Sequence, residues 1–327
     1  MEKKYHVYAL GNALVDMEFA VEDEFLNQKN IDKGVMTLVD TDQQQALYEA
    51  LAGHRGKMAS GGSAANTIIA VSHFGGKAFY SCKVANDPAG DFYVQDLVAA
   101  GVDTNLHQER EPGISGKCIV MITPDAERTM HSHLGISETV SEAELHPDAI
   151  QASDYVYLEG YLVTSPSGRA AAIRARDIAR EAGVKTALTF SDPNMVRFFR
   201  EGLGEMLGTG VDLLFCNREE ALTWADTDDL DQACAALKQV ANNFAITLGK
   251  DGALLFDGQQ THQVPATPVK AVDTNGAGDM FAGALLYGLT HGYSLPEAGR
   301  LATRAAAQLV TQFGPRLAAE DHKPLLA

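Results

Sequence analysis

The stretch at residues 273–288 reads DTNGAGDMFAGALLYG and places small residues and a carboxylate directly before an apolar helical pattern. Gly276, Ala277 and Gly278 let backbone N–H groups converge at the start of that helix, which favours anion binding. Gly278 is expected to need a positive φ. Asp279 lies in the first helical turn, where the helix dipole is expected to lower its pKa and keep it ionised. The stretch predicts an anion-binding turn at a helix N-terminus with a carboxylate in the first helical turn, and the alternative is that Asp279 only caps the helix beside a tight turn.

Two other phosphate-binding motifs do not fit this stretch. A dinucleotide-binding fingerprint needs a third glycine where Phe281 stands, and it belongs to an early β-α unit. A Walker A loop needs the pattern GxxxxGK[ST], which the sequence lacks. We therefore expect a different kind of phosphate-binding turn.

Composition and charge limit the possible partners. The 327 residues are 46% hydrophobic and 21% charged, which suits one large α/β domain with an accessory part. The formal net charge of -17 disfavours nucleic acid and anionic membranes, and no segment is expected to span a membrane. The scattered cysteines are expected to be reduced packing residues of a cytoplasmic protein, with no metal cluster; they are Cys82, Cys118, Cys216 and Cys234.

From about Asp154 onward, short apolar runs alternate with amphipathic helical patterns. This alternation predicts a parallel sheet covered by helices on both faces. The helical pattern that begins after residue 167 is expected to end at Gly183, and residues 250–252 are expected to form the turn of a hairpin at one side of the sheet.

The N-terminal part of the chain has a different pattern. Residues 15–40 and 114–133 contain polar strand-like stretches, which suit strands with one wet face. We expect these two ranges to form a small discontinuous β lid beside the main sheet. The stretch ASGGSAAN between them is expected to be a glycine loop that runs into a helix. The open edge of such a lid can pair with a second copy, so both a monomer and a homodimer through the lid are expected.

Five motifs in sequence order resemble those of the ribokinase-like (PfkB) carbohydrate and nucleoside kinases. DTNGAGDMFAGAL matches the family's C-terminal signature, and GGSAANTIIAVSHFGG resembles its N-terminal signature. The motifs GNALVD, NREE and TLGKDG also occur in the family's order. The resemblance covers residues 1–327 as one domain. It implies a ribokinase-like three-layer α/β/α fold with a central, mostly parallel sheet and a small β lid.

The resemblance also implies how phosphoryl transfer is arranged. Asp279 is expected to accept the proton of the acceptor hydroxyl, and Gly276, Ala277 and Gly278 are expected to bind the transferred γ-phosphoryl group of ATP. Arg128 resembles the lid arginine that reaches the phosphates.

Two further motifs are expected on the ATP side. Asn217 and Glu220 in NREE resemble residues that organise Mg²⁺, with Glu220 acting through water, although a helix N-terminus that favours acids is the alternative. Thr247, Gly249 and Gly252 resemble the loop that passes close to ATP, where a simple hairpin turn is the alternative. A monovalent cation such as K⁺ near Asp273 is a further possibility within this resemblance.

The acceptor is expected to bind the N-terminal motifs. Asp16 and Asn66 offer an acceptor and a donor for vicinal hydroxyl groups, and Gly62 allows close approach of a sugar. The expected acceptor residues are Asn12, Asp16, Gly62, Ser63, Asn66, Tyr161 and Asn275.

Within the family, GNALVD, Asn275 and EGYLVTSP resemble the adenosine kinases, so Tyr161 is expected to stack on a base with Leu14 on the other side. The implied reaction is transfer from ATP to the 5′-hydroxyl of adenosine, giving AMP and ADP. The alternatives are a kinase of ribose, fructose or another free sugar, with Tyr161 in the core, and a non-catalytic nucleoside-binding protein.

Overall fold

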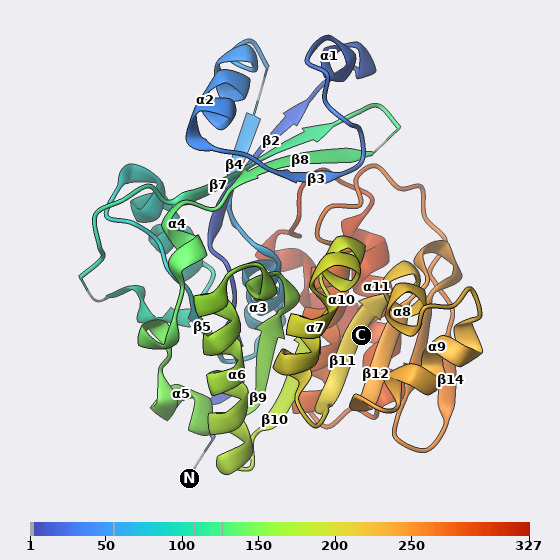
Figure 1. The fold of residues 1–327 in the computed structure, drawn as a ribbon. Coiled ribbons are helices and arrows are strands. Elements are labelled where there is room, and N and C mark those ends of the chain that lie inside the picture. The colour runs from blue at the N-terminus through green and yellow to red at the C-terminus, as the bar shows by residue number, and fades with distance from the viewer. Residues whose placement is uncertain (1–2, 55, 108, 126) are drawn as a thin grey trace.

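A computed structural model describes residues 3–54, 56–107, 109–125 and 127–327 (Figure 1). Within these ranges the chain forms a nine-stranded sheet in the order β14-β13-β12-β11-β10-β9-β1-β5-β6. Its strands are β1 (Tyr5–Leu10), β5 (Ala78–Ser81), β6 (Asp103–Thr104), β9 (Ser153–Glu159), β10 (Lys185–Thr189), β11 (Val211–Asn217), β12 (Ala241–Thr247), β13 (Ala253–Phe256) and β14 (Thr261–Val264). The strands from β12 to β6 pair in parallel, whereas β12 and β13 pair antiparallel around the turn at residues 250–252, which confirms the predicted hairpin, and β14 adds a further antiparallel strand at the edge.

Helices cover both faces of this sheet, as the ribokinase-like fold requires. They are α3 (Ser63–Phe74), α4 (Pro88–Ala99), α5 (Pro147–Gln151), α6 (Pro166–Glu181), α7 (Pro193–Leu207), α8 (Arg218–Ala225), α9 (Leu230–Leu237), α10 (Ala277–Thr290) and α11 (Leu295–Leu309). Two further helices, α1 (Asp23–Gln28) and α2 (Thr41–Ala50), lie away from this sheet, at the top of Figure 1. The predicted helix end is confirmed, because Gly183 follows α6 with a φ of 67°.

The alternation of side chains along each parallel strand produces two separate cores. On β1, Val7 and Ala9 join the core under α3, α4, α10 and α11, whereas Tyr8 and Leu10 join the core under the helices α5 to α9. All four side chains are fully buried. A strand that is apolar on both faces is the pattern of a parallel sheet between two helical layers.

A second, smaller sheet lies at one end of the main sheet, above the carboxyl ends of its parallel strands (Figure 1). In the described residues it has the order β3-β8-β7-β2-β4. Its strands are β2 (Leu14–Ala20), β3 (Met36–Leu38), β4 (Gly56–Gly61), β7 (Gly116–Ile122) and β8 (Arg128–His133). We call these five strands the small sheet.

The small sheet includes more of the chain than the two ranges named from the sequence. Residues 15–40 and 114–133 supply most of β2 and all of β3, β7 and β8, with helix α1 between β2 and β3; residue 126 lies outside the described residues. The second half of strand β4, residues 59–61, was expected to belong to a glycine loop, so that part of the prediction was wrong. The many small residues of β4 do not alternate between apolar and polar, so its sequence does not indicate a strand. The segment is a strand because it pairs antiparallel with β2.

The two faces of β2 differ, but the polar face is not exposed to solvent, so the expected wet face was wrong for this strand. Val15, Met17 and Phe19 belong to the main apolar core, whereas Asp16 and Glu18 alternate with them and are buried polar residues. No helix in the described part of the chain is long and apolar enough to cross a membrane.

The turn before α10 depends on Gly276, and the expectation of a positive φ at Gly278 was wrong. Gly276 is the residue before the first turn and has a φ of 72°, and a Cβ atom there would clash with the backbone of Pro315. Gly278 already lies in the helix, and a Cβ atom there would have no neighbour within 4 Å.

This difference predicts opposite effects of two matched substitutions. Gly276→Ala should lower the free energy of unfolding by about 2 kcal/mol or more, because it adds a left-handed alanine and a backbone clash. Gly278→Ala should leave the melting temperature unchanged or slightly higher. Thermal unfolding of both variants beside the wild type checks this, and equal melting temperatures for the two variants would contradict it.

Candidate active site

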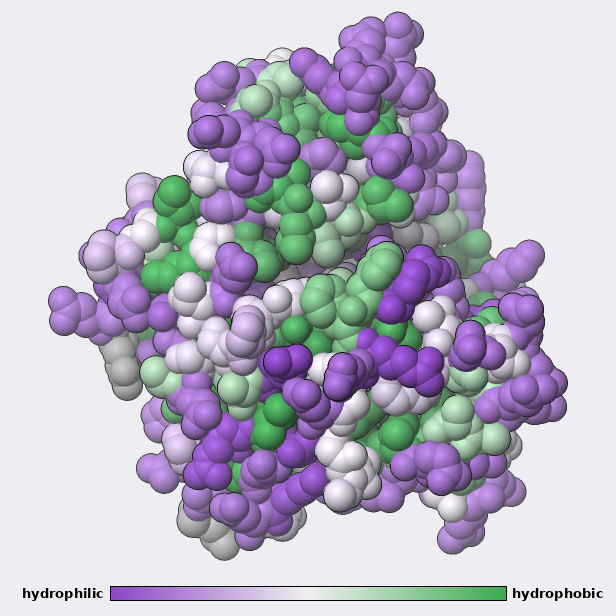
Figure 2. All heavy atoms as spheres, viewed as in Figure 1, coloured by the Kyte–Doolittle hydropathy of each residue, from purple (hydrophilic) through white to green (hydrophobic). Residues whose placement is uncertain are grey.

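A cavity of about 280 Å³ lies between the small sheet and the carboxyl ends of the main-sheet strands. The space-filling view shows this region hollowed, with apolar side chains on both sides of it (Figure 2). The cavity is lined by most of the residues that the sequence singled out: Asn12, Leu14, Asp16, Gly62, Ser63, Asn66, Arg128, Tyr161, Asn217, Glu220, Thr247, Asn275, Gly276, Ala277, Gly278 and Asp279. Gly249 and Gly252 do not line it.

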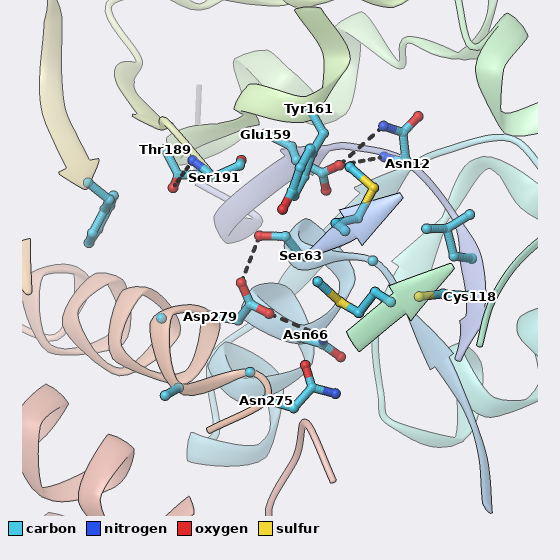
Figure 3. Close-up of a pocket in the computed structure, with 18 of the residues that line it drawn as sticks. Asn12, Ser63, Asn66, Cys118, Glu159, Tyr161, Thr189, Ser191, Asn275 and Asp279 are labelled. Carbon is cyan, nitrogen blue, oxygen red and sulfur yellow. Dashed lines mark hydrogen bonds between the residues drawn. The ribbon is translucent and has the colours of Figure 1, made fainter. Parts of the chain in front are cut away.

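Asp279 stands where the first turns of two helices meet. One carboxylate oxygen accepts a hydrogen bond from the Ser63 hydroxyl at 2.7 Å, and the other accepts one from the Asn66 amide at 3.2 Å (Figure 3). Ser63 and Asn66 lie in the first turn of α3, and Asp279 lies in the first turn of α10. The carboxylate therefore has a fixed direction toward the cavity.

The pKa of Asp279 is raised, so the expectation that the helix dipole lowers it was wrong. Burial is the main cause, because it disfavours the charged carboxylate, and the hydrogen bonds from Ser63 and Asn66 oppose it. The positive charge of Arg128 also opposes it. A carboxylate with a raised pKa is a stronger base once it is ionised, which suits proton transfer near neutral pH.

The start of α10 offers backbone donors to an anion beside Asp279. Ala277 and Gly278 are the first two residues of the helix and both line the cavity. The first N–H groups of a helix have no intrahelical acceptor and lie at the positive end of the dipole. Because a Cβ atom at Gly278 would meet open space, this glycine leaves room for a ligand.

Arg128 connects the small sheet to this turn. It begins β8, and its guanidinium donates to the Asn275 side-chain oxygen at 2.7 Å. The Asn275 amide in turn donates to Glu18 on β2 at 3.3 Å. Arg128 therefore lies over the anion site predicted at α10, and its hydrogen bond to Asn275 holds it there.

Asp273 anchors the same turn from below. Its carboxylate accepts the N–H groups of Asn275 at 2.8 Å and of Gly314 at 2.9 Å, and the residue is fully buried. These two hydrogen bonds give Asp273 a structural function in the DTNGAGD motif. The monovalent cation near Asp273 stays a prediction.

Asp16 and Asn66 present polar groups to the acceptor part of the cavity. Burial, and then the negative charge of Glu18, raise the pKa of Asp16 to about 8, so this carboxyl is mostly protonated at neutral pH and can donate as well as accept. The amide nitrogen of Asn66 is used by Asp279, and its side-chain oxygen has no partner among the described residues. Both residues line the cavity, although the Asn66 oxygen itself is buried.

Tyr161 lies across the cavity from a group of apolar side chains, which we call the roof. It lies in the 3₁₀ turn Gly160–Thr164 after β9, and its side chain points into the cavity (Figure 3). The roof comes from the small sheet and the residues next to it, and its cavity-lining members are Leu14, Met36, Leu38, Cys118, Met130 and Leu134. This arrangement can hold a flat ring by apolar contact.

Asn217 and Glu220 form a capping box at the start of α8. The Asn217 backbone and side-chain nitrogens both donate to Glu220 (3.0 and 2.8 Å), and the Glu220 N–H donates to the Asn217 side-chain oxygen at 2.8 Å. Burial raises the pKa of Glu220 to about 8. The helix-capping alternative is thus realised, and both residues also line the cavity.

The carboxyl groups of the cavity suit only a Mg²⁺ ion that takes most of its ligands from phosphates and water. Among the described residues, no group of three His, Cys, Asp or Glu side chains could hold a metal ion. Mg²⁺ that is bound mainly by phosphates and water needs only one or two protein carboxylates. That Glu220 holds such an ion through water stays a prediction, because its two carboxyl oxygens accept hydrogen bonds from Asn217.

The TLGKDG motif contributes less to the cavity than expected. Of its three named residues, only Thr247 lines the cavity. Gly249 and Gly252 have φ values of 58° and 91°, and a Cβ atom at Gly252 would clash with the backbone of Val264. The hairpin turn accounts for Gly252, and the proximity of both glycines to ATP stays a prediction.

Several cavity residues were not named from the sequence, among them Glu159, Thr189 and Ser191. Glu159 ends the buried strand β9, and a charged residue that ends an apolar run was the available signal. Ser191 has a φ of 70°, rare for a residue other than glycine, and its hydroxyl accepts the N–H of Gly160 at 2.9 Å. No local signal in the sequence marks Thr189 or Ser191.

The buried carboxyl groups predict how stability depends on pH. Because the pKa of Asp16 is raised to about 8, the folded chain keeps a proton that the unfolded chain loses near pH 4. Between these values the folded state binds more protons, so this group makes the free energy of unfolding fall as pH rises.

Asp16→Asn should therefore stabilise the protein relative to the wild type by an amount that grows with pH, on the order of 2 kcal/mol between pH 5.5 and 8.5. Melting temperatures of both proteins at the two pH values, at constant ionic strength, check this. A difference between variant and wild type that does not change with pH would contradict it.

Comparisons with known proteins agree with this fold. The model of the pfkB family carbohydrate kinases matches residues 31–322. An adenosine kinase from Saccharomyces cerevisiae is 28% identical over 95% of this chain and 96% of its own length. The crystal structure of adenosine kinase from Sinorhizobium meliloti superposes with a TM-score of 0.92 at 34% identity, covering 99% of this chain and 100% of that one. A probable sugar kinase from Rhizobium etli CFN 42 gives a TM-score of 0.93 at 33% identity, covering 98% of each chain. The chain therefore belongs to the pfkB family and is a kinase of that family.

Proposed function

We propose that the chain transfers the γ-phosphoryl group of ATP to the 5′-hydroxyl of adenosine, giving AMP and ADP. The observation that carries this proposal is the pairing of Tyr161 with an apolar roof on one side of the cavity and of Asp279 with the start of α10 on the other. Relatives named adenosine kinase support the choice of a nucleoside.

In the proposed reaction, Asp16 and Asn66 bind the ribose hydroxyl groups and Tyr161 packs on the base. The 5′-hydroxyl then lies near Asp279, which takes its proton while the new oxygen–phosphorus bond forms and the bond from the γ-phosphorus to the bridging oxygen of ADP breaks. The N–H groups of Ala277 and Gly278 stabilise the charge on the transferred group.

The small sheet is proposed to act as a lid. Arg128 would exchange its bond to Asn275 for the phosphate oxygens when the lid closes, because a phosphate is a stronger acceptor than an amide oxygen. Mg²⁺ held through Glu220 would neutralise charge on the ATP phosphates. Whether the chain works as a monomer or as a homodimer through the edges of the small sheet stays a prediction.

ATP as the donor favours the cytoplasm as the place of this reaction. The AMP formed would return a free nucleoside to the nucleotide pool, which is a purine salvage step. A second candidate acceptor is a free sugar such as ribose or fructose, and the similarity to the probable sugar kinase favours it.

Competition between acceptors tests the proposal. With MgATP in excess, adenosine should be phosphorylated with a kcat/KM at least about tenfold above those of ribose and fructose, because only adenosine fills the space between Tyr161 and the roof. Release of ADP, with each acceptor alone and in pairs, measures this. Equal or faster turnover of a free sugar would contradict the nucleoside and leave the kinase in place.

A further inference from the structure

Glu159 is a buried carboxylate that the reaction described above does not use. It ends β9 in the middle of the main sheet and is 1% exposed. No ion pair involves it among the described residues. A buried carboxylate is stable only when its oxygens accept hydrogen bonds, so the donors that surround it identify what it holds in place.

Those donors come from two separate parts of the active site. One oxygen of Glu159 accepts the N–H of Ala64 at 2.8 Å, in the first turn of α3. The other accepts both the backbone N–H and the side-chain amide of Asn12, each at 3.3 Å (Figure 3). The carboxylate therefore ties the loop after β1 to the start of α3.

Asn12 is fixed from its other sides as well. The buried hydroxyl of Ser137 donates to the Asn12 side-chain oxygen at 3.4 Å and accepts the N–H of Ala13 at 2.8 Å. The hydroxyl of Tyr80 donates to the Asn12 carbonyl oxygen at 2.9 Å. Such a set of bonds leaves the Asn12 side chain, which lines the cavity, with one orientation.

The contact between these segments is also tight. A Cβ atom at Gly11 would clash with the Glu159 carboxylate and with Ala64, and a Cβ atom at Gly62 would clash with the Asn12 carbonyl oxygen. The loop after β1 and the start of α3 can therefore move relative to each other only if the bonds to Glu159 change.

We infer that Glu159 is a positioning residue for phosphoryl transfer, which sets the distance between the acceptor bound at Asn12 and the base Asp279. The connection runs from Asn12 through Glu159 to the first turn of α3, where Ser63 and Asn66 hold the Asp279 carboxylate. Ser137 supports the same function from the opposite side of Asn12. The choice of adenosine as the acceptor in the test rests on the proposed function.

The Glu159→Gln substitution changes the hydrogen bonds that connect Asn12 to α3, while the side chain keeps nearly the same shape. Its amide oxygen can still accept from Asn12, but its NH₂ group then faces the N–H of Ala64, and two donors repel each other. The acceptor and the base should move apart by a fraction of an ångström. We expect kcat to fall by about 10- to 100-fold, because a shift of this size between the acceptor hydroxyl and the base slows the transfer by about that factor. KM for adenosine should rise. KM for ATP should change less than about twofold, since Asn217 and Thr247 lie on other elements.

Glu144→Gln is the matched control. Glu144 is a mostly buried carboxylate that accepts two hydrogen bonds, both from Ser141, and it pairs with Lys83 at 3.5 Å. It does not line the cavity, so its loss should leave all three kinetic constants near wild type. Ser137→Ala is a milder second variant, which should raise KM for adenosine severalfold even if Glu159→Gln does not fold.

The measurement is steady-state kinetics with adenosine and ATP varied separately, with the folded fraction of each variant determined by thermal unfolding. If the wild type does not phosphorylate adenosine, the proposed function fails, and the same constants are measured with the sugar that it does phosphorylate. A loss of kcat with unchanged KM for ATP supports the inference. Wild-type constants in folded Glu159→Gln, or a parallel loss in Glu144→Gln, would overturn it.

Discussion

The active site depends on two helix N-termini that meet at one carboxylate. Helix α3 brings Ser63 and Asn66, helix α10 brings Asp279, and the two hydrogen bonds between them join residues more than 200 positions apart in the sequence. Because the N–H groups of a first helical turn need acceptors, this region is also where an anion is bound most easily. Backbone geometry thus places the proposed base beside the proposed anion site.

The charge of this site is the second constraint. The chain carries a net charge of -17, and its cavity holds Asp16, Glu159, Glu220 and Asp279, each with a raised pKa. Burial is the largest cause in every case. An ATP molecule brings further negative charge into this cavity. The backbone donors of α10, Arg128 and a phosphate-bound Mg²⁺ are the groups that can compensate it.

Much of the architecture was predictable because its signals are local. Strands that are apolar on both faces, the glycine after α6 and the hairpin turn near Gly252 each follow from a few adjacent residues. The motifs also identified most of the residues that line the cavity.

The remaining features depend on contacts between distant segments. Strand β4 exists because β2 pairs with it, and the roof residue Met36 and the strained Ser191 reach the cavity only through the tertiary fold. The pKa of Asp279 could not be predicted from its place on a helix, because burial outweighs the dipole there. Glu159 was missed for a related reason, since its hydrogen-bond partners lie in two other parts of the chain.

The central claim is that Asp279 takes the proton of the acceptor, and the kinetics of Asp279→Asn test it most directly. The amide has nearly the same shape, so the fold and the affinity for ATP should stay near wild type, while kcat should fall by about 10²- to 10⁴-fold, as for loss of a general base. Measured with adenosine, MgATP and correctly folded protein, a collapse of kcat with unchanged ATP binding is the predicted result. Retention of most of the wild-type kcat would contradict the account, because the carboxylate would then serve only to join α3 to α10.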